Sequence, residues 1–162
     1  MLIIATGGTF DKDYNPQNGL LHFTQSCVPD LLTQARVNAG YRFVSLLQKD
    51  SLDMQTEDRA LIADTCLQAD EQRILIIHGT DTMTDTGHYL QQQTALNTKT
   101  IVLTGAMRPQ AFGQSDAIFN LGYAFAMTQQ QEAGIYIAIQ GDLFHTTQVI
   151  KDRQAAQFVR TT

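Results

Sequence analysis

The sequence predicts an α/β protein with an open, mostly parallel sheet of about five strands and helices on both faces, a Rossmann-like three-layer arrangement. Short apolar segments alternate with longer segments of helical period, which is the pattern of such a sheet. Three of the apolar segments also end at a glycine turn that carries small polar residues. These turns are Thr6-Gly7-Gly8-Thr9, His78-Gly79-Thr80-Asp81-Thr82-Met83 and Leu103-Thr104-Gly105-Ala106-Met107-Arg108-Pro109. Because the carboxyl ends of parallel strands share one edge of a sheet, we expect the three turns to line one crevice.

Five segments rich in Ile, Val, Leu or aromatic residues have the length and boundaries of strands buried on both faces. They are residues 2–5, 41–47, 73–77, 100–104 and 135–140. Four segments between them repeat apolar residues at helical spacing. These are residues 29–37, 56–69, 85–96 and 115–128, with Thr56 and Ser115 as expected N-caps. Strands that alternate with helices predict right-handed crossovers throughout.

Composition limits the classes of function. With 162 residues and 43% hydrophobic content, the chain is expected to form one domain over residues 1–162. The net charge of −5, with lysine and arginine scattered singly, argues against a nucleic-acid partner. No apolar run approaches the roughly 20 residues that cross a bilayer, so no membrane partner is expected. The first residues enter a strand-like segment without the pattern of a signal peptide, which predicts a cytoplasmic protein.

Cysteine and histidine show no ligand spacing. Cys27 and Cys66 form no C-x-x-C pair and are expected as packed, reduced thiols. The four histidines are far apart in the sequence, so neither a metal nor another cofactor is predicted.

The first glycine turn has two interpretations. Two glycines after a buried strand allow close backbone approach, which serves either a phosphate cradle or an exposed hydroxyl nucleophile. The phosphate interpretation is the weaker, because the G-x-G-x-x-G and G-K-[ST] patterns are absent. A plain strand-ending turn with a capping threonine explains the pattern equally well. The long connection that follows, residues 10–25, is predicted to be a lid or binding loop.

The second turn and the C-terminal part add further polar candidates. Asp81 and Thr82 could cap the next helix, but capping does not require Thr80. A hydroxyl, a carboxylate and backbone N–H groups would also serve an oxyanion or a substrate ammonium. His78 and Arg108 are expected to be structural. Lys151 is either a surface lysine or, if desolvated, a base near neutral pH.

These motifs resemble those of the N-terminal domain of the bacterial-type L-asparaginases, threonine amidohydrolases with two signature turns. Residues 6–9 resemble the first signature, residues 78–83 the second and residues 105–109 a further family segment. The likeness extends over essentially the whole chain. It implies hydrolysis of L-asparagine to L-aspartate and ammonia.

The resemblance also implies roles for single residues. Thr9 would be the nucleophile that attacks the side-chain amide and forms an acyl-enzyme. Lys151 would act through Thr80 to activate a nucleophile or water. Tyr14, in the predicted lid, resembles a mobile tyrosine that helps to activate the nucleophile. The positions implied to bind substrate are Ser51, Asp53, Gly79, Thr80, Asp81 and Ala106, with Asp81 holding the α-ammonium.

The chain departs from the family in its domain organisation. Family members usually carry a second, smaller domain, and a neighbouring protomer's copy of it closes the site. Residues 1–162 match only the first domain and retain Lys151 and the tail to Arg160, so we expect a short form without the second. An incomplete crevice predicts a homo-oligomer, a dimer or tetramer, and a KM above that of two-domain relatives.

Two alternatives to an L-asparaginase remain. One is an amidase for glutamine or a modified asparagine, because one methylene changes discrimination by only about 1–3 kcal/mol. The other is a catalytically silent module that binds aspartate or asparagine. The set of Thr9, Thr80, Asp81 and Lys151 favours an enzyme, because a silent module has no need for a base beside a hydroxyl.

Overall fold

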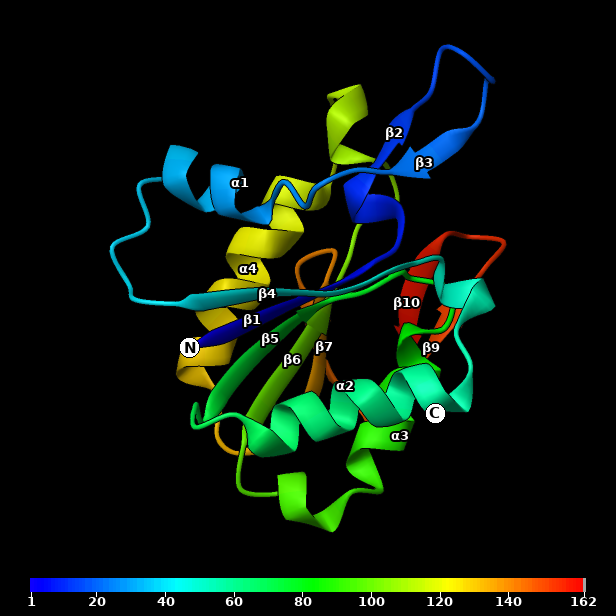
Figure 1. The fold of residues 1–162 in the computed structure, drawn as a ribbon. Coiled ribbons are helices and arrows are strands. Elements are labelled where there is room, and N and C mark those ends of the chain that lie inside the picture. The colour runs from blue at the N-terminus through cyan, green and yellow to red at the C-terminus, as the bar shows by residue number, and fades with distance from the viewer. Residues whose placement is uncertain (162) are drawn as a thin grey trace.

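A six-stranded sheet lies between two layers of helices in the computed structural model, which describes residues 1–161 (Figure 1). The strands are β1 (Leu2–Gly7), β4 (Arg42–Lys49), β5 (Arg73–Ile77), β6 (Thr100–Thr104), β7 (Gly134–Ile139) and β8 (Asp142–His145). Their order is β4-β1-β5-β6-β7-β8. The first five are parallel, and β8 runs antiparallel to β7. The predicted α/β class is confirmed, and β8 is an addition that follows a two-residue turn at Gln140 and Gly141, both with positive φ.

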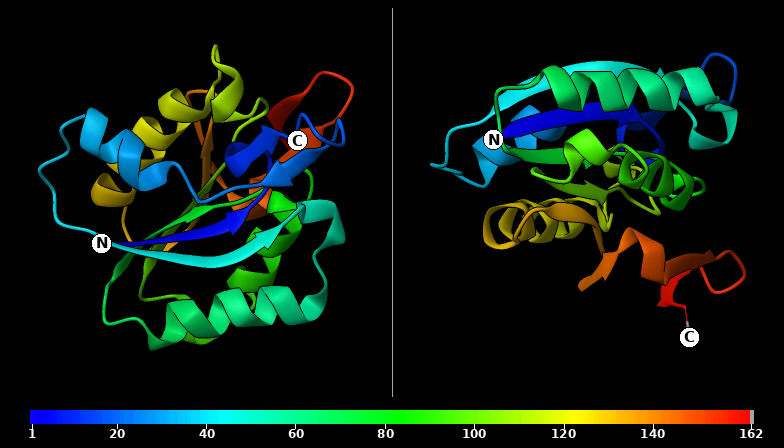
Figure 2. Two further views of the ribbon diagram at one scale, coloured as in Figure 1. Left: turned by 45° about the horizontal axis from the view of Figure 1, so that its top comes forward. Right: turned by 90° about the horizontal axis from the view of Figure 1, so that it is seen from below.

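Two α-helices cover each face of this sheet. They are α1 (Val28–Gln34), α2 (Thr56–Gln68), α3 (Met83–Gln91) and α4 (Ala117–Gln130). Helices α1 and α4 lie on one face, and α2 and α3 lie on the other (Figure 2). Alternate residues of each strand serve the two layers: in β1, Ile4 packs with the α2–α3 layer and Ile3 with the α1–α4 layer. Because both faces are covered, the strands β1, β5, β6 and β7 are buried almost without interruption. The edge strand β4 is only partly buried, so the expectation of burial on both faces is wrong for this strand.

Two small antiparallel hairpins accompany the main sheet. The strands β2 (Lys12–Tyr14) and β3 (Leu21–Phe23) form the first, within the connection predicted to be a lid. The strands β9 (Val149–Asp152) and β10 (Gln157–Arg160) form the second, which the sequence pattern does not predict. Cys27 and Cys66 are free, and burial raises the pKa of each thiol to about 12. Within residues 1–161, no helix is both long and apolar enough to cross a bilayer.

The connection from β6 through α4 to β7 has an unusual hand. Strands β5, β6 and β7 are successive neighbours, so the crossovers containing α3 and α4 step in the same direction. They do so on opposite faces of the sheet, so their hands are opposite. The connection through α2 steps in the same direction as that through α3 and lies on the same face, so the two have the same hand. The connection through α1 steps in the opposite direction on the opposite face, which gives it this hand too. Since nearly all such crossovers are right-handed, the α4 connection is left-handed, and the prediction of right-handed crossovers throughout is wrong here.

Asn120 fixes this left-handed connection. Its buried side-chain amide donates to the carbonyl oxygen of Gly105 (3.0 Å), at the end of β6, and to Asp116 Oδ2 (2.9 Å). Its Oδ1 accepts from the N–H of Gln140 (3.0 Å), at the end of β7. One side chain on α4 therefore ties together the ends of the two strands that the helix connects.

The helix starts differ from the predicted ones. Helix α2 begins at Thr56, but its N-cap is Gln55, whose N–H donates to Asp58 Oδ2 (2.8 Å). Helix α4 has Asp116 at the N-cap, while Ser115 Oγ accepts from the N–H of Ala117 (3.0 Å). Both predicted caps are therefore one residue out of place. Helix α3 begins and ends earlier than residues 85–96, and a separate 3-10 turn covers Thr94–Leu96.

Substituting Asn120 with alanine will leave the buried carbonyl of Gly105 and the partly buried N–H of Gln140 without their partner. We expect the free energy of unfolding to fall by about 2–4 kcal/mol. Urea denaturation followed by circular dichroism measures this loss. Asn97→Ala, at an exposed position, is the control and should change stability by less than about 0.5 kcal/mol. Equal effects of the two substitutions would contradict the role given to Asn120.

Candidate active site

The turns after β1 and β5 contact each other through their glycines. Gly8 has a φ of +75°, and a Cβ there would lie 2.4 Å from the Cα of Gly79. A Cβ on Gly79 would in turn lie 2.6 Å from Ser51 Oγ. These approaches exclude any side chain from both positions. The chain thus brings Thr9, directly after Gly8, beside the turn that carries Thr80.

The turn after β6 joins the same group. The N–H of His78 donates to the carbonyl oxygen of Thr104 (2.8 Å), and a Cβ on Gly105 would lie 2.2 Å from the carbonyl oxygen of His78. The three turns therefore meet at one edge of the sheet, as their sequence pattern predicts. The Ala106 side chain is buried in the core layer of α1 and α4, so this residue can offer a ligand its backbone only.

Lys151 lies between the two polar side chains of the second turn. Its Nζ donates to Thr80 Oγ1 and to Asp81 Oδ1, each at 2.7 Å. The lysine side chain is only 9% exposed, whereas that of Asp81 is 36% exposed. Lys151 comes from β9, so the second hairpin supplies a cation to a turn about 70 residues earlier in the chain. The structure thus brings Thr80, Asp81 and Lys151 together in one hydrogen-bonded cluster.

Ser51 lies against the same turn with its hydroxyl unused. The residue is 1% exposed, and among residues 1–161 its Oγ has no hydrogen-bond partner. The Ser51 carbonyl oxygen accepts from Thr82 Oγ1 (2.7 Å), which fixes this turn to the second glycine turn. A buried hydroxyl without a partner costs stability, so it is available to a ligand. Asp53 is exposed at the end of the same 3-10 turn, and within residues 1–161 no hydrogen bond joins its side chain to the cluster.

Thr9 and Tyr14 lie on the segment that leads into the first hairpin. Thr9 is half-buried and begins a 3-10 turn, Thr9–Asp11, while Tyr14 in β2 is 52% exposed. The Asp11 carboxylate accepts from the N–H of Cys27 (3.1 Å), which anchors the end of this turn to α1. Burial raises the pKa of Asp11 and outweighs the hydrogen bonds from Ser26 and Cys27, which lower it.

His78 is buried and satisfied, as expected of a structural histidine. Its Nδ1 donates to the carbonyl oxygen of Gly79 (2.8 Å), which leaves Nε2 to accept from the Thr86 hydroxyl (2.9 Å). Burial lowers the pKa of His78 to about 4, so the ring is neutral at physiological pH. It holds the backbone of the second turn and does not face the Thr80 cluster as a base.

Residues around the third turn hold its shape. Arg108 Nε donates to the carbonyl oxygen of Gly113 (3.0 Å), which confirms the structural role predicted for it. The Asp116 carboxylate accepts from the N–H groups of Met107 (2.9 Å) and Arg108 (3.0 Å). The sequence reasoning missed Asp116, although an aspartate just before a helical pattern is a usual capping signal.

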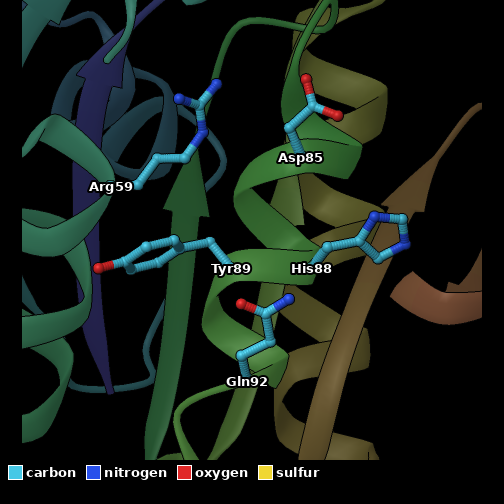
Figure 3. Close-up of a pocket in the computed structure, with 5 residues that line it drawn as sticks. All are labelled: Arg59, Asp85, His88, Tyr89 and Gln92. Carbon is cyan, nitrogen blue, oxygen red and sulfur yellow. The ribbon is translucent and has the colours of Figure 1, made fainter. Parts of the chain in front are cut away.

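A separate groove lies between α2 and α3, with a volume of about 360 Å³. It is lined by Arg59, Asp85, His88, Tyr89 and Gln92 (Figure 3). None of these is a predicted site residue. Arg59 Nη1 donates to the carbonyl oxygen of Met54 (3.1 Å), so one wall of the groove supports the end of the turn that carries Ser51.

The order of the strands and the position of the polar cluster indicate the class of protein. The five parallel strands have a doubly wound order, in which the strand order reverses between β1 and β5. Ligands bind at this point of such sheets. The hydroxyls, carboxylate and ammonium described above gather there. The model of the N-terminal domain of asparaginases matches residues 1–157, and the chain belongs to the asparaginase family.

Individual relatives agree with this assignment. An L-asparaginase and a component of the glutamyl-tRNA(Gln) amidotransferase, both from Thermococcus kodakarensis, are each 29% identical to the chain. The matches cover 93% and 89% of this chain, respectively, but 47% and 34% of those proteins. The glutaminase-asparaginase of Acinetobacter glutaminasificans is also 29% identical, over 93% of this chain and 49% of that protein.

A solved structure shows the same fold. The thermostable L-asparaginase from Thermococcus kodakarensis matches with a TM-score of 0.84 and 29% identity, over 98% of this chain and 50% of that one. The chain therefore spans half or less of the length of these relatives.

The neutral, buried His78 makes stability depend on pH. Its pKa is about 4 in the folded state and about 6.5 when unfolded, so between these values the unfolded state binds more protons. We expect this contribution to stability to be present above pH 6.5 and to be lost as pH falls towards 4, by up to about 1.4 kcal/mol per pH unit. Urea denaturation between pH 4.5 and 7 will show a weaker dependence in His78→Gln. The exposed His88→Gln should keep the original slope, and an unchanged slope in His78→Gln would refute the assignment.

Proposed function

We propose that the protein hydrolyses the side-chain amide of L-asparagine to L-aspartate and ammonia, with Thr9 as nucleophile. The observation that carries this proposal is the position of Lys151, whose buried ammonium bonds both Thr80 and Asp81 at the edge of the sheet where Thr9 lies. A hydroxyl is a weak nucleophile until a neighbouring group takes its proton. The cluster supplies a hydroxyl and an amine for that task.

The chemistry follows from this arrangement in two stages. Thr9 Oγ attacks the amide carbonyl carbon, its proton passes to the departing nitrogen, and ammonia leaves an ester on Thr9. A water molecule then attacks the ester and releases aspartate. The substrate's α-ammonium competes with Lys151 for the Asp81 carboxylate. A lysine released from that ion pair loses a proton to water, and as a neutral amine it then accepts a proton from Thr80. Substrate binding thus prepares the base.

Ser51 is placed to bind the other end of the substrate. Its buried hydroxyl has no partner within residues 1–161 and adjoins Gly79, next to Thr80 and Asp81. A carboxylate is a strong acceptor for such a donor. We assign the α-carboxylate to Ser51 and the backbone of Gly79, and keep Asp53, Ala106 and Tyr14 as proposed members of the site.

The relatives favour one alternative within the same chemistry. A glutaminase-asparaginase and an amidotransferase component match at the same identity as an L-asparaginase, so glutamine or another small amide is the second candidate substrate. Asp81 is one-third exposed, which supports a homo-oligomer, dimer or tetramer, that covers the open side of the site. A cytoplasmic location is part of the proposal, supported by the matched probable cytoplasmic L-asparaginase from Campylobacter jejuni.

Removing either reactive side chain will abolish turnover. With millimolar L-asparagine, we expect ammonia release to fall by about 10²- to 10⁴-fold or more in Thr9→Ala and Lys151→Met. Positions outside the cluster provide the controls Thr33→Ala and Lys49→Met, which should stay within about 2-fold of the unsubstituted chain. Parallel assays with L-glutamine identify the preferred amide. No turnover of either amide by a folded chain that aspartate stabilises against heat would instead establish a binding module.

Replacing Ser51 with alanine should weaken substrate binding without lowering the stability of the fold. Loss of the carboxylate donor should raise KM by about 10-fold with little change in kcat. Because the hydroxyl is buried without a partner, the free energy of unfolding should stay level or rise. Steady-state kinetics and urea denaturation test both parts, with the exposed Ser45→Ala as control. A large loss of stability together with an unchanged KM would overturn the assignment.

A further inference from the structure

We infer that the ion pair between Lys12 and Asp50 holds the Thr9 turn in register with the Ser51 turn, which makes these two residues positioning residues for the reaction. The inference rests on the proposed function, because it takes Thr9 as nucleophile and Ser51 as a substrate contact. Neither side chain bonds the Thr80 cluster. Their role is to set the distance between two turns that come from different strands.

Asp50 shapes the Ser51 turn. It is the N-cap of the 3-10 turn Ser51–Asp53, and its Oδ1 accepts from the N–H of Leu52 (3.0 Å). Its second oxygen, Oδ2, accepts from Lys12 Nζ. One carboxylate therefore caps the turn that carries Ser51 and binds a residue from the other side of the site.

Lys12 closes the Thr9 turn in the same way. Its backbone N–H donates to the carbonyl oxygen of Thr9 and ends the 3-10 turn there. Its side chain is 16% exposed, and its ammonium lies 5.4 Å from the centre of the Phe23 ring. The backbone of Lys12 thus fixes the turn of the nucleophile, and its side chain reaches Asp50. This contact spans 38 residues of sequence.

Electrostatics favour the ionised form of the Asp50 carboxyl group. Burial raises the pKa of Asp50, but the hydrogen bonds from Lys12 and Leu52 and the charges of Lys12 and Lys151 outweigh it and hold that pKa below its usual value. Asp50 thereby lies within the field of Lys151. Removing the Lys12 charge leaves a carboxylate in the site with one counter-charge fewer, so the turn it caps loses its fixed orientation.

A nearby ion pair serves as a matched control. Lys49 Nζ bonds Asp58 Oδ2 at 2.7 Å and links the end of β4 to the first turn of α2. Like the Lys12 pair, it is partly buried and joins two elements. Its side chains bond neither the Thr9 turn nor the Ser51 turn.

The test compares Lys12→Met, Asp50→Asn, their combination and Lys12→Arg with Lys49→Met. Met keeps an unbranched apolar side chain without the charge, and Asn keeps an acceptor for the Leu52 N–H. A small displacement of the nucleophile should lower kcat by about 10- to 100-fold and raise KM by about 5-fold at most. The double variant should match the worse single variant, because both remove one interaction. Lys12→Arg should regain most of the activity, and Lys49→Met should stay within about 2-fold.

Melting temperatures separate positioning from folding. The Lys12 and Lys49 variants should melt at similar temperatures, so a loss of kcat confined to the Lys12–Asp50 pair is not a general loss of stability. Additive effects of the two single substitutions, or an equal loss in Lys49→Met, would overturn the inference.

A second measurement tests the role of the Lys12–Asp50 pair even if the proposed function is wrong. If the unsubstituted chain releases no ammonia, the proposed function fails, and the pair is judged by calorimetric titration with L-aspartate. Weaker aspartate binding by about 5-fold in Lys12→Met, but not in Lys49→Met, would still support positioning of the Ser51 turn. Equal aspartate affinity in both variants would reject it.

Discussion

The backbone contact between Gly8 and Gly79 is the constraint on which the arrangement of the site depends. With no Cβ on either residue, the turns after β1 and β5 approach until their main chains touch. Ser51 fills the space on the other side of Gly79, so three segments are fixed relative to one another by steric exclusion. Hydrogen bonds then orient side chains within that frame. A methyl group at either glycine would force the frame apart before any polar group was altered.

The left-handed connection through α4 shapes the same edge of the sheet from the other face. The chain leaves β6 at Gly105, crosses to the α1 layer and begins α4 at Ala117, and Asn120 ties the route to the ends of β6 and β7. The segment between β6 and β7 therefore lies on the α1 face and does not cover the α3 face of the sheet. The β9–β10 hairpin packs against α3 there, and it is from this hairpin that Lys151 reaches Thr80. An uncommon topology thus accompanies the entry of a distant lysine.

Local patterns predict the parallel sheet, its helices and the meeting of the glycine turns, because apolar period and strand-end chemistry are properties of short segments. The contact between Lys151 and Thr80 is implied by family resemblance only, since about 70 residues separate the two and no local pattern encodes that distance. The α4 connection is tied at both ends by Asn120, whose partners Gly105 and Gln140 lie 15 and 20 residues away, so no local pattern shows them. The Lys12–Asp50 pair escapes prediction for the same reason. Single charges in a turn are usually solvated, and only the fold shows which of them meet.

The β9–β10 hairpin is expected to open before the main sheet unfolds. It forms its own two-stranded sheet and is attached to the main one through side chains such as Gln140, which accepts from the N–H of Phe158 (3.1 Å) and donates to the carbonyl oxygen of Ala156 (2.9 Å). Opening such a unit exposes far less apolar surface than melting the six-stranded sheet, so its local unfolding has a lower free energy. Lys151 departs with it. Under mild denaturing conditions the population therefore contains molecules that keep an intact core but have lost the contact of Lys151 with Thr80 and Asp81. If Lys151 is the base that we propose, the rate of turnover will report this subglobal opening.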